Sequence, residues 1–243
     1  MKGIERKMKH EWIKSILKRE ENEESIKVNA WVRSKRVSKS IAFLVISDGS
    51  CQETLQLIIE AGSEAFETLE SIHTGAAIAA EGELRESPAR GQKWEILVRK
   101  LELIGSSSAT DYPLQKKNHT LEYLREIAHL RPRTNTFGAV FRVRHVISQA
   151  IHEFLSDSGF YWAHTPILTA NDCEGAGELF QVSTLSLNKV PQQNGQVDYT
   201  KDFFGKATHL TVSGQLEAEF LALSMGRVYT FGPTFRAENS NTS

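Results

Sequence analysis

The sequence predicts an α+β protein, in which a small five-stranded β-barrel is followed by a second domain of mixed helices and strands. Three observations lead to this prediction. Five short segments rich in aliphatic and β-branched residues come first, then a small, polar stretch at 105–113, then a long amphipathic helical pattern. Because a polar stretch that ends in proline is typical of an interdomain linker, we expect domains at 1–105 and 121–243, with a linker at 106–120.

Before the linker, the hydrophobic pattern predicts one helix that precedes five strands, and a second helical segment among them. A helical stripe lies at 8–17, and 63–71, between the third and fourth strands, also looks helical. The strands are expected at 26–33, 41–48, 54–60, 76–85 and 94–104. Residues 48–50 signal a turn, and 87–91 signal the tip of a hairpin. Five strands with a helix between the third and fourth is the order of an OB barrel, and a different small barrel is the alternative.

After the linker, a long amphipathic helix is expected at 137–156, with Gly159 placed to end it in the left-handed conformation. A strand is expected at 160–169, where Pro166 limits it to an edge or a strand end. Segment 191–199, rich in Gln and Asn, is interpreted as a flexible insertion. The remaining elements expected are a helix at 215–224 and a strand at 227–236.

The composition limits the class of function. The chain has 29 Lys and Arg against 30 Asp and Glu, a formal charge of -1, which excludes nucleic-acid binding by bulk charge alone. The longest aliphatic and aromatic run, 41–46, is far too short to span a bilayer, and the N-terminus has no apolar signal core. The two cysteines lie far apart and match no metal or redox spacing. We therefore expect a soluble, cytoplasmic protein with no membrane partner and no metal ligands of its own.

Basic and aromatic residues gather in the first domain. Four cations lie within seven positions, next to strands that bear two aromatic side chains: Arg33, Lys35, Arg36 and Lys39, with Trp31 and Phe43. This combination suits single-stranded nucleic acid, because cations bind phosphates and an unstacked base lies on an aromatic ring. The alternative is a solvated loop, with Phe43 in the barrel core.

Arg236 ends an otherwise apolar segment of the second domain. A guanidinium held on such a scaffold can bind a phosphate or a carboxylate through two parallel hydrogen bonds. The alternative is a structural ion pair with Glu238. The sequence has no GxxxxGK phosphate loop and no GxGxxG after a strand, so nucleotide chemistry here would need another scaffold.

Two further groups of polar residues precede Arg236. The loop carboxylates Glu174 and Glu178 suit an acid/base pair or an ammonium site, and a solvated loop is the alternative. Ser213 is a good N-cap for the expected helix at 215–224, and Gln215 adds both a donor and an acceptor that capping does not require.

Several stretches, in the right order, resemble class IIb aminoacyl-tRNA synthetases, and most closely their asparaginyl branch. In the anticodon-binding barrel they are 30–33, 43–45 and 48–50, and at the entry to the catalytic domain they are 123–125, 130–131 and 133–135. Motif 1 is represented by 158–160 and 165–167, and the loop over the amino acid by 174–180. The amino-acid site is represented by 210–216, and the first half of motif 2 by 231–239. The implied fold is an OB-type barrel followed by an incomplete class II antiparallel-sheet catalytic domain. The implied activity is ATP-dependent activation of L-asparagine and its transfer to tRNA-Asn, by a homodimer that uses ATP and Mg2+.

The resemblance also implies roles for individual residues. In the catalytic domain they are Arg236 for the ATP α-phosphate, Glu238 for the adenosine or its metal, and Glu174, Ser213, Gln215 and Glu217 for the amino acid. In the rest of the chain they are Phe43 stacked on the central anticodon base, Arg33 and Gln56 hydrogen-bonding near it, and Pro166 in the dimer-forming element. Because the attacking group is the carboxylate of the amino acid, no covalent nucleophile is implied, and catalysis is mostly positioning.

The segment 215–219 bears on the choice of amino acid. Aspartyl relatives have a lysine there, whereas this segment carries two glutamates and no cation. An aspartate side chain would find no partner, while a neutral amide can donate to an acidic group. The alternatives are aspartyl or lysyl specificity.

The family's motif 2 continues beyond the point that corresponds to Ser243, and its metal ligands and motif 3 follow later still. The resemblance therefore implies little or no synthetase activity for this chain by itself. The alternative in another class of function is a non-catalytic, tRNA-binding OB module.

Overall fold

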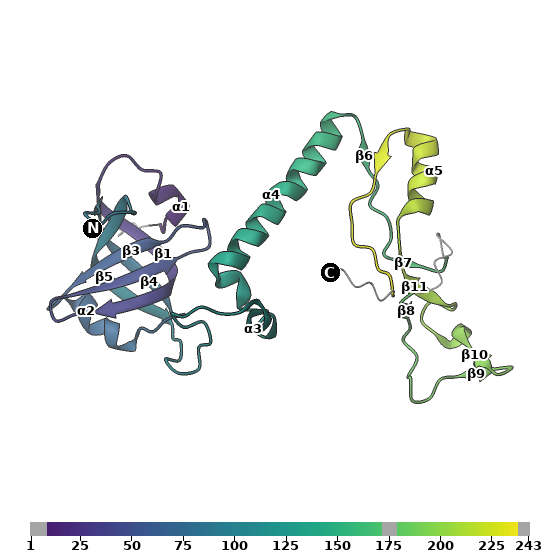
Figure 1. Ribbon diagram of the computed structural model, residues 1–243, viewed down its shortest axis with the longest axis horizontal. Coiled ribbons are helices and arrows are strands. Elements are labelled where there is room, and N and C mark those ends of the chain that lie inside the picture. Colours follow the sequence, from purple (N-terminus) through teal and green to yellow (C-terminus); the bar gives the residue numbers. More distant parts are fainter. Residues whose placement is uncertain (1–8, 172–178, 238–243) are drawn as a thin grey trace, which may run out of the picture. The chain divides into compact units, whose positions relative to one another are not determined.

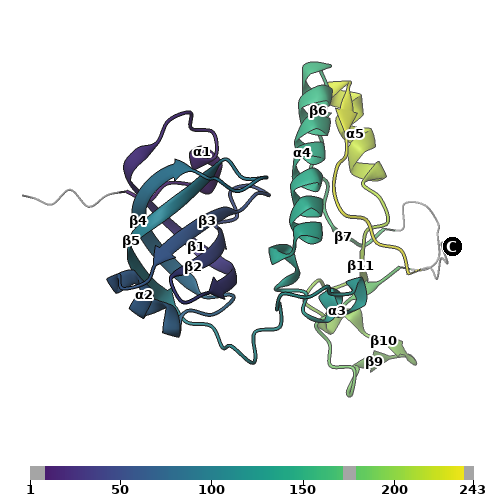
Figure 2. The ribbon, with the colours of Figure 1, turned by 60° about the vertical axis from the view of Figure 1, so that its left-hand side comes forward.

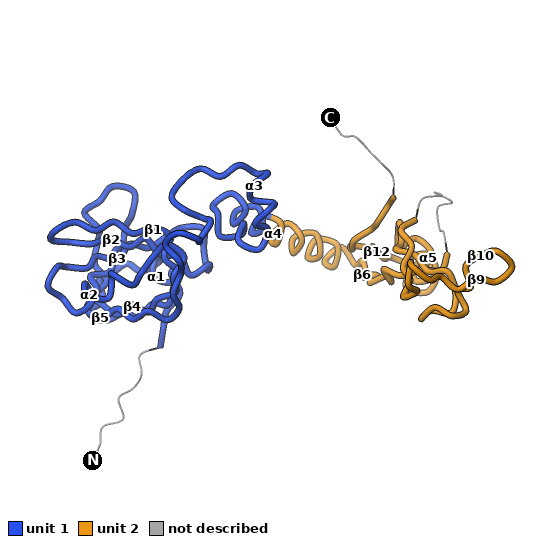
Figure 3. Tube along the Cα trace, turned by 90° about the horizontal axis from the view of Figure 1, so that it is seen from below, with its two compact units in different colours: residues 1–143 blue, residues 144–243 orange. Residues whose placement is uncertain are grey.

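The structure is a computed structural model that describes residues 9–171 and 179–237 (Figure 1). It divides into two compact units, residues 1–143 and 144–243, and the boundary falls within helix α4 (Asn135–Asp157) (Figure 3). Residues 106–143, which include the expected linker, therefore belong to the same unit as the barrel. Among the described residues, no helix has both the length and the apolar character needed to cross a membrane.

The first unit contains a closed barrel of five strands (Figures 1 and 2). They are β1 (Glu23–Val37), β2 (Ile41–Ser47), β3 (Leu55–Glu60), β4 (Ala77–Glu86) and β5 (Trp94–Gly105), closed in the order β1-β2-β3-β5-β4. Helix α2 (Glu64–Thr68) and the 3-10 turn η1 (Leu69–Ser71) lie between β3 and β4, and Ser63 caps α2 by accepting a hydrogen bond from the Phe66 amide. All neighbouring strands are antiparallel except β3 and β5, which are parallel. The predicted OB-type barrel is confirmed.

The barrel core follows from the period-2 pattern of the strands. On β2, Ala42, Leu44 and Ile46 are fully buried, while the residues between them are only half-buried. Helix α1 (Ile13–Ile16) adds Ile13 and Ile16, both 0% exposed, to this core. Burying two such side chains stabilises the barrel by about 1.5–3 kcal/mol each.

The turn between β2 and β3 is organised by Asp48. Its carboxylate accepts hydrogen bonds from the Ser50 amide at 2.9 Å and from the Ser50 hydroxyl at 2.6 Å, and Gly49 supplies the positive φ of 80°. The other carboxylate oxygen accepts from the Ile13 amide at 2.7 Å, which ties the turn to α1. The turn expected at 48–50 is therefore present, and it also fixes the N-terminal helix.

The start of α4 is joined to the same turn. The Arg142 guanidinium donates to the carbonyl oxygens of Gly49 at 2.8 Å and Cys51 at 2.7 Å, and to Oε1 of Gln52 at 3.1 Å. The Gln52 side chain in turn donates to the Asn135 carbonyl at 2.9 Å. Between the barrel and α4 lie α3 (Leu121–Glu126) and the 3-10 turn η2 (Arg131–Arg133).

The second unit is built from short strands. Three form an antiparallel sheet in the order β7 (Leu168–Thr169), β11 (Thr208–Leu210), β8 (Gln181–Val182). Two form a parallel pair, β6 (Tyr161–Trp162) and β12 (Val228–Tyr229). The other elements are the hairpin of β9 (Gln192–Gln193) and β10 (Gln196–Val197), the turn η3 (Tyr199–Lys201) and helix α5 (Gln215–Met225).

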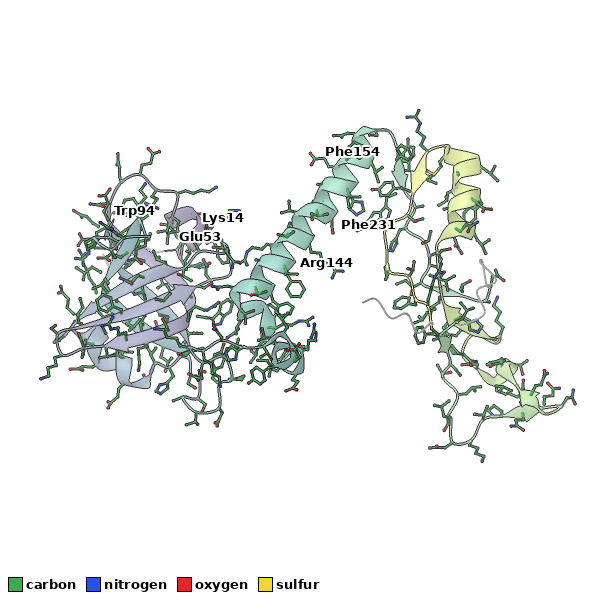
Figure 4. The ribbon with its side chains drawn as sticks, in the orientation of Figure 1. Lys14, Glu53, Trp94, Arg144, Phe154 and Phe231 are labelled. Atoms are coloured by element: carbon green, nitrogen blue, oxygen red, sulfur yellow. The ribbon has the colours of Figure 1, made fainter. Side chains whose placement is uncertain are left out.

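An aromatic cluster joins α4 to the parallel pair inside the second unit. His152 on α4 shares a 2.6 Å hydrogen bond between its Nδ1 and the Tyr229 hydroxyl. Its ring lies 4.7 Å from that of Trp162 and 4.8 Å from that of Phe231, which Figure 4 shows next to the helix. These contacts fix the C-terminal half of α4 against β6 and β12.

Four expectations for the second unit are wrong. The strand expected at 160–169 is broken, because β6 and β7 belong to different sheets and Pro166 lies between them without an N–H to donate. The strand expected at 227–236 is limited to Val228–Tyr229. Segment 191–199 contains a hairpin in place of a flexible insertion. Gly214, and not Ser213, occupies the N-cap position of α5, although the Ser213 hydroxyl accepts from the Gln215 amide at 3.3 Å.

Candidate functional site

Arg33 lies at a β-bulge in β1. Val32 pairs with Ile46 and Ser34 with Val45, so Arg33 is the extra residue between two adjacent pairs. Its guanidinium donates to the Arg133 carbonyl, and to Oδ1 of Asn135 at 3.2 Å. Burial lowers the pKa of Arg33, the Tyr112 phenol opposes that shift, and the nearby Arg133 charge adds to it. The bulge thus points Arg33 at the segment that leads into α4.

Phe43 lies on the outward face of β2. It is half-buried and lies between the inward-facing Ala42 and Leu44, outside the core cluster. The alternative that Phe43 fills the barrel core is therefore wrong. Its partner across the β1–β2 ladder is Arg36, whose side chain is exposed. An aromatic ring on the outer side of a barrel can stack on an unpaired base, and an exposed cation beside the ring can bind the phosphate.

Gln56 completes the predicted anticodon set. Gln56 pairs with Val45 on β2. Since Val45 and Phe43 are two residues apart on the same outward face, Gln56 and Phe43 are diagonal neighbours on adjacent strands. Arg33 borders the same ladder position, since Ser34 also pairs with Val45. The barrel register therefore brings the three residues onto adjoining strands, although Arg33 already has internal hydrogen-bond partners.

The remaining basic residues divide into two kinds. Lys35 donates through Nζ to the Leu69 carbonyl at 2.9 Å, and burial lowers its pKa while the Glu70 charge opposes that shift. Lys39, like Arg36, is exposed. Lys35 therefore stabilises the η1 turn, and only Arg36 and Lys39 of the four clustered cations lie wholly at the surface.

The predicted amino-acid site surrounds the start of α5. Gln215 is exposed and its Nε2 donates to Oε1 of Glu219 at 2.9 Å, while Ser213 and Glu217 are half-buried. A Cβ on Gly214 would lie 2.4 Å from Oγ1 of Thr165, so only glycine allows this close approach. Ser213, Gln215 and Glu217 thus share one helix start.

Arg236 follows a backbone segment that runs beside this helix start. The Phe235 amide donates to the Thr211 carbonyl at 2.9 Å, and the Thr211 amide donates to the Ile167 carbonyl at 2.8 Å. Thr211 is two residues before Ser213, so the backbone next to Arg236 lies against the approach to the predicted amino-acid site. Glu174, Glu178 and Glu238 lie outside the described residues, and so does the expected Arg236–Glu238 pair.

Residues 9–171 and 179–237 contain no group of three or more His, Cys, Asp or Glu side chains that could hold a metal ion.

Sequence reasoning missed the residues that face Arg33. Arg133 places its guanidinium 5.0 Å from the centre of the Trp31 ring, and Lys116 and Lys117 lie across from it in the expected linker. The adjacent lysines at 116–117 are a local signal of positive charge in the expected linker.

The fold defines a class of protein: a closed OB barrel followed by a unit of short strands and helices, in which the residues predicted for an amino-acid site lie at one helix start. Comparison with known families agrees. Residues 118–243 match the model for tRNA synthetases class II (D, K and N), and residues 26–104 match that of the OB-fold nucleic acid binding domain. The chain belongs to the class II tRNA synthetases of the D, K and N group.

Among its relatives is the Asparagine--tRNA ligase of Geotalea uraniireducens, 57% identical over 220 residues, which are 90% of this chain and 48% of the relative. The Asparagine--tRNA ligase of Synechocystis sp. is 52% identical over 229 residues, 94% of this chain and 50% of the relative. The chain thus spans about half the length of the curated relatives it matches.

Solved structures show the same fold. Asparaginyl-tRNA synthetase from Pyrococcus horikoshii, complexed with asparaginyl-adenylate, superposes with a TM-score of 0.77 at 24% identity, covering 96% of this chain and 50% of that one. A putative aspartyl-tRNA synthetase from Leishmania major gives a TM-score of 0.73 at 21% identity, over 100% of this chain and 46% of that one.

Proposed function

We propose that the whole protein is an asparagine–tRNA ligase, which activates L-asparagine with ATP and transfers it to tRNA-Asn. The observation that carries this proposal is the 57% identity, over 90% of the chain, to a relative named as such a ligase. The proposed domains are an anticodon-binding barrel at 1–105, a linker at 106–120 and a catalytic part at 121–243. The proposed location is the cytoplasm.

In the barrel, the proposed role of Phe43 is to stack on the central base of the anticodon. Its outward position and the exposed Arg36 opposite support this role. Arg33 and Gln56 hydrogen-bond to neighbouring nucleotides in this proposal, and Arg33 would then exchange part of its contact with Arg133 and Asn135 for RNA. Stacking on one ring contributes about 1–3 kcal/mol to binding.

In the catalytic part, the proposed role of Arg236 is electrostatic. The asparagine carboxylate attacks the α-phosphorus of ATP, the bond to pyrophosphate breaks, and negative charge builds on the phosphoryl oxygens. A fixed guanidinium next to these oxygens stabilises that charge in the transition state. In this proposal Glu238 contacts the adenosine or its metal, and Mg2+, as expected for the family, would neutralise the phosphates.

Asparagine is seated, in this proposal, by Glu174, Ser213, Gln215 and Glu217. The start of α5 supports a choice of amide over carboxylate, because Glu217 and Glu219 lie there and the segment Gln215–Glu219 has no cation. A side-chain carboxylate would be repelled, whereas an amide NH2 donates to a glutamate. The proposed partners are tRNA-Asn, L-asparagine, ATP and a second copy of the chain, with Pro166, which is exposed, at the dimer interface.

Amino-acid-dependent ATP–pyrophosphate exchange by the complete protein tests the ligase proposal. Exchange that depends on asparagine, and not on aspartate or lysine, is the expected result. Exchange driven by aspartate would contradict the specificity, and exchange with none of the three would contradict the activity.

A second candidate function is tRNA binding by the barrel without catalysis. The closed barrel and the outward position of Phe43 on β2 favour it. The variant Phe43→Ala should weaken tRNA-Asn binding about 5- to 150-fold, the equivalent of one lost stack. Phe43→Tyr keeps the ring and serves as the matched control. In the complete protein, Phe43→Ala should leave adenylate formation unchanged, and equal loss of both activities would contradict the role given to Phe43.

A further inference from the structure

A cleft of about 630 Å³ opens beside the bulge of β1, within the first unit. One wall is the barrel, through Arg33, Ser34 and Val45. The opposite wall is the segment from Tyr112 to Thr136, which leads from β5 to the start of α4. Of the proposed anticodon set only Arg33 lines this cleft, and none of Ser213, Gln215, Glu217 and Arg236 does.

The charges that line the cleft all have one sign. Arg33, Lys116, Lys117 and Arg133 contribute four cations, and His119 lies among them. None of the described residues that line the cleft is Asp or Glu. A concave surface with cations of one sign focuses a positive potential and attracts an anion.

The two arginines are held in place by the protein. Arg33 donates to the Arg133 carbonyl and to Asn135, while Arg133 donates to the Tyr112 hydroxyl at 3.3 Å and covers the Trp31 ring. Neither has a carboxylate partner among the described residues, so the charge of each guanidinium is not neutralised. Their mutual repulsion is relieved when an anion enters.

The two lysines are available for a ligand. Lys116 and Lys117 are exposed, and neither side chain makes a hydrogen bond or an ion pair with any other described residue. Long, hydrated ammonium groups of this kind bind phosphates as point charges.

The cleft continues the face that carries Phe43. Val45 lines the cleft, and Phe43 lies two residues away on the same outward side of β2. Two residues of a strand span about 6.8 Å, close to the reach of one extended nucleotide. A nucleotide chain whose base stacks on Phe43 would therefore pass its next phosphates into the cleft.

We propose that this cleft binds the phosphodiester backbone of the RNA strand next to the base stacked on Phe43. Lys116 and Lys117 each neutralise one phosphate, and Arg33 and Arg133 supply the fixed positive field behind them. The proposal rests on the proposed function, because it takes Phe43 as the base platform. It adds a backbone-binding site that gives affinity without reading sequence.

Salt dependence tests the cleft with the chain of residues 1–243. The probe is a fluorescent RNA stem-loop that carries the tRNA-Asn anticodon, titrated by anisotropy at several KCl concentrations. A phosphate contact to single-stranded nucleic acid contributes about -0.7 to the slope of log K against log [salt]. Lys116→Ala/Lys117→Ala should make the slope shallower by about 1.4 and weaken binding about 25-fold at 0.1 M salt, roughly fivefold per lysine.

Two controls separate charge in the cleft from charge in general. Lys18→Ala/Lys100→Ala removes two exposed lysines of the same unit that do not line the cleft, and should leave slope and affinity near those of the parent chain. Phe43→Ala should weaken binding and leave the slope unchanged. The preference for the asparagine anticodon over an altered loop should survive in the Lys116/Lys117 variant.

An unchanged slope and affinity in Lys116→Ala/Lys117→Ala would overturn the proposal that the cleft binds RNA phosphates. The proposed function would still stand in that case if Phe43→Ala weakens binding. Equal effects of the two double variants would also overturn it, since any lysine would then serve. If neither Phe43→Ala nor Lys116→Ala/Lys117→Ala changes binding, the result contradicts both the phosphate-binding role of the cleft and the anticodon-binding role of the barrel.

Discussion

Gly82 provides a stringent test of the barrel, because a side chain at this position of β4 would meet the backbone of β5. A Cβ at this position would lie 2.1 Å from the Leu97 carbonyl oxygen and 2.9 Å from the Cα of Val98. Both neighbours are backbone atoms of the paired strand, so no side chain can rotate away. The β4–β5 register shifts between Glu81 and Gly82, which makes the glycine part of a bulge.

Gly82→Ala should therefore force the two strands apart. Overpacking typically costs about 1–3 kcal/mol. Opening the ladder loses one or two backbone hydrogen bonds at about 1 kcal/mol each. We expect the free energy of unfolding of the first unit to fall by about 2–5 kcal/mol, the sum of these two costs.

Urea unfolding followed by tryptophan fluorescence measures this change, and amide exchange in β4 and β5 locates it. Gly105→Ala is the matched control on the same sheet, because its Cβ would meet only the Ala77 Cβ at an ordinary 3.7 Å. That control should stay within about 0.5 kcal/mol of the parent chain. A Gly82→Ala chain as stable as the Gly105→Ala chain would refute the close approach of β4 and β5.

Two further predictions concern single polar side chains. Arg142→Ala removes the hydrogen bonds from α4 to the turn at 48–52. Amide exchange in this turn and in the first turns of α4 should therefore accelerate about fivefold or more, as for a loss of about 1 kcal/mol. Unchanged exchange would contradict the role of Arg142 in joining the turn to α4. Hydrogen bonds from Ser183, and then from the amide and hydroxyl of Thr184, hold the pKa of Asp202 at about 2, below its ordinary 3.8. Because the folded pKa is the lower one, the stabilisation is complete above about pH 4 and is lost as the pH falls through about 2. A carbon-13 titration of the Asp202 carboxylate checks this, and a midpoint near 3.8 would contradict these hydrogen bonds.

The barrel could be predicted from the sequence because β1 and β2 alternate between buried and more exposed residues, while β3, β4 and β5 each carry a short run of buried, mostly apolar residues. Alternation along β2 already separates Ala42 and Leu44 from Phe43. The second unit could not be read in the same way. Its strands have two or three residues each, so pairing with distant segments, and not local alternation, decides where a strand begins.

The hairpin of β9 and β10 had a local signal that composition concealed. Asn194 and Gly195 have φ values of 53° and 78°, as a tight turn between antiparallel strands requires, and Asn-Gly is the common sequence for such a turn. The abundance of Gln and Asn suggested flexibility, but the turn residues were the more informative feature.

The sites were predictable to different degrees. The outward position of Phe43 follows from alternation, whereas the bulge at Arg33 depends on a register between β1 and β2 that no local pattern encodes. The basic cleft required residues 33 and 133 to meet through the fold, which spacing in the chain could not reveal.

In the proposed complex with tRNA-Asn, the outward face of the barrel holds the central base of the anticodon. Photocrosslinking tests it most directly, with 5-bromouridine at the central anticodon position of the tRNA-Asn stem-loop and mass spectrometry of the crosslinked peptide. We expect a crosslink within β2 on the peptide that contains Phe43, and we expect it to be lost in Phe43→Ala and kept in Lys18→Ala/Lys100→Ala. Crosslinks found only in residues 144–243, or equally abundant without Phe43, would contradict it.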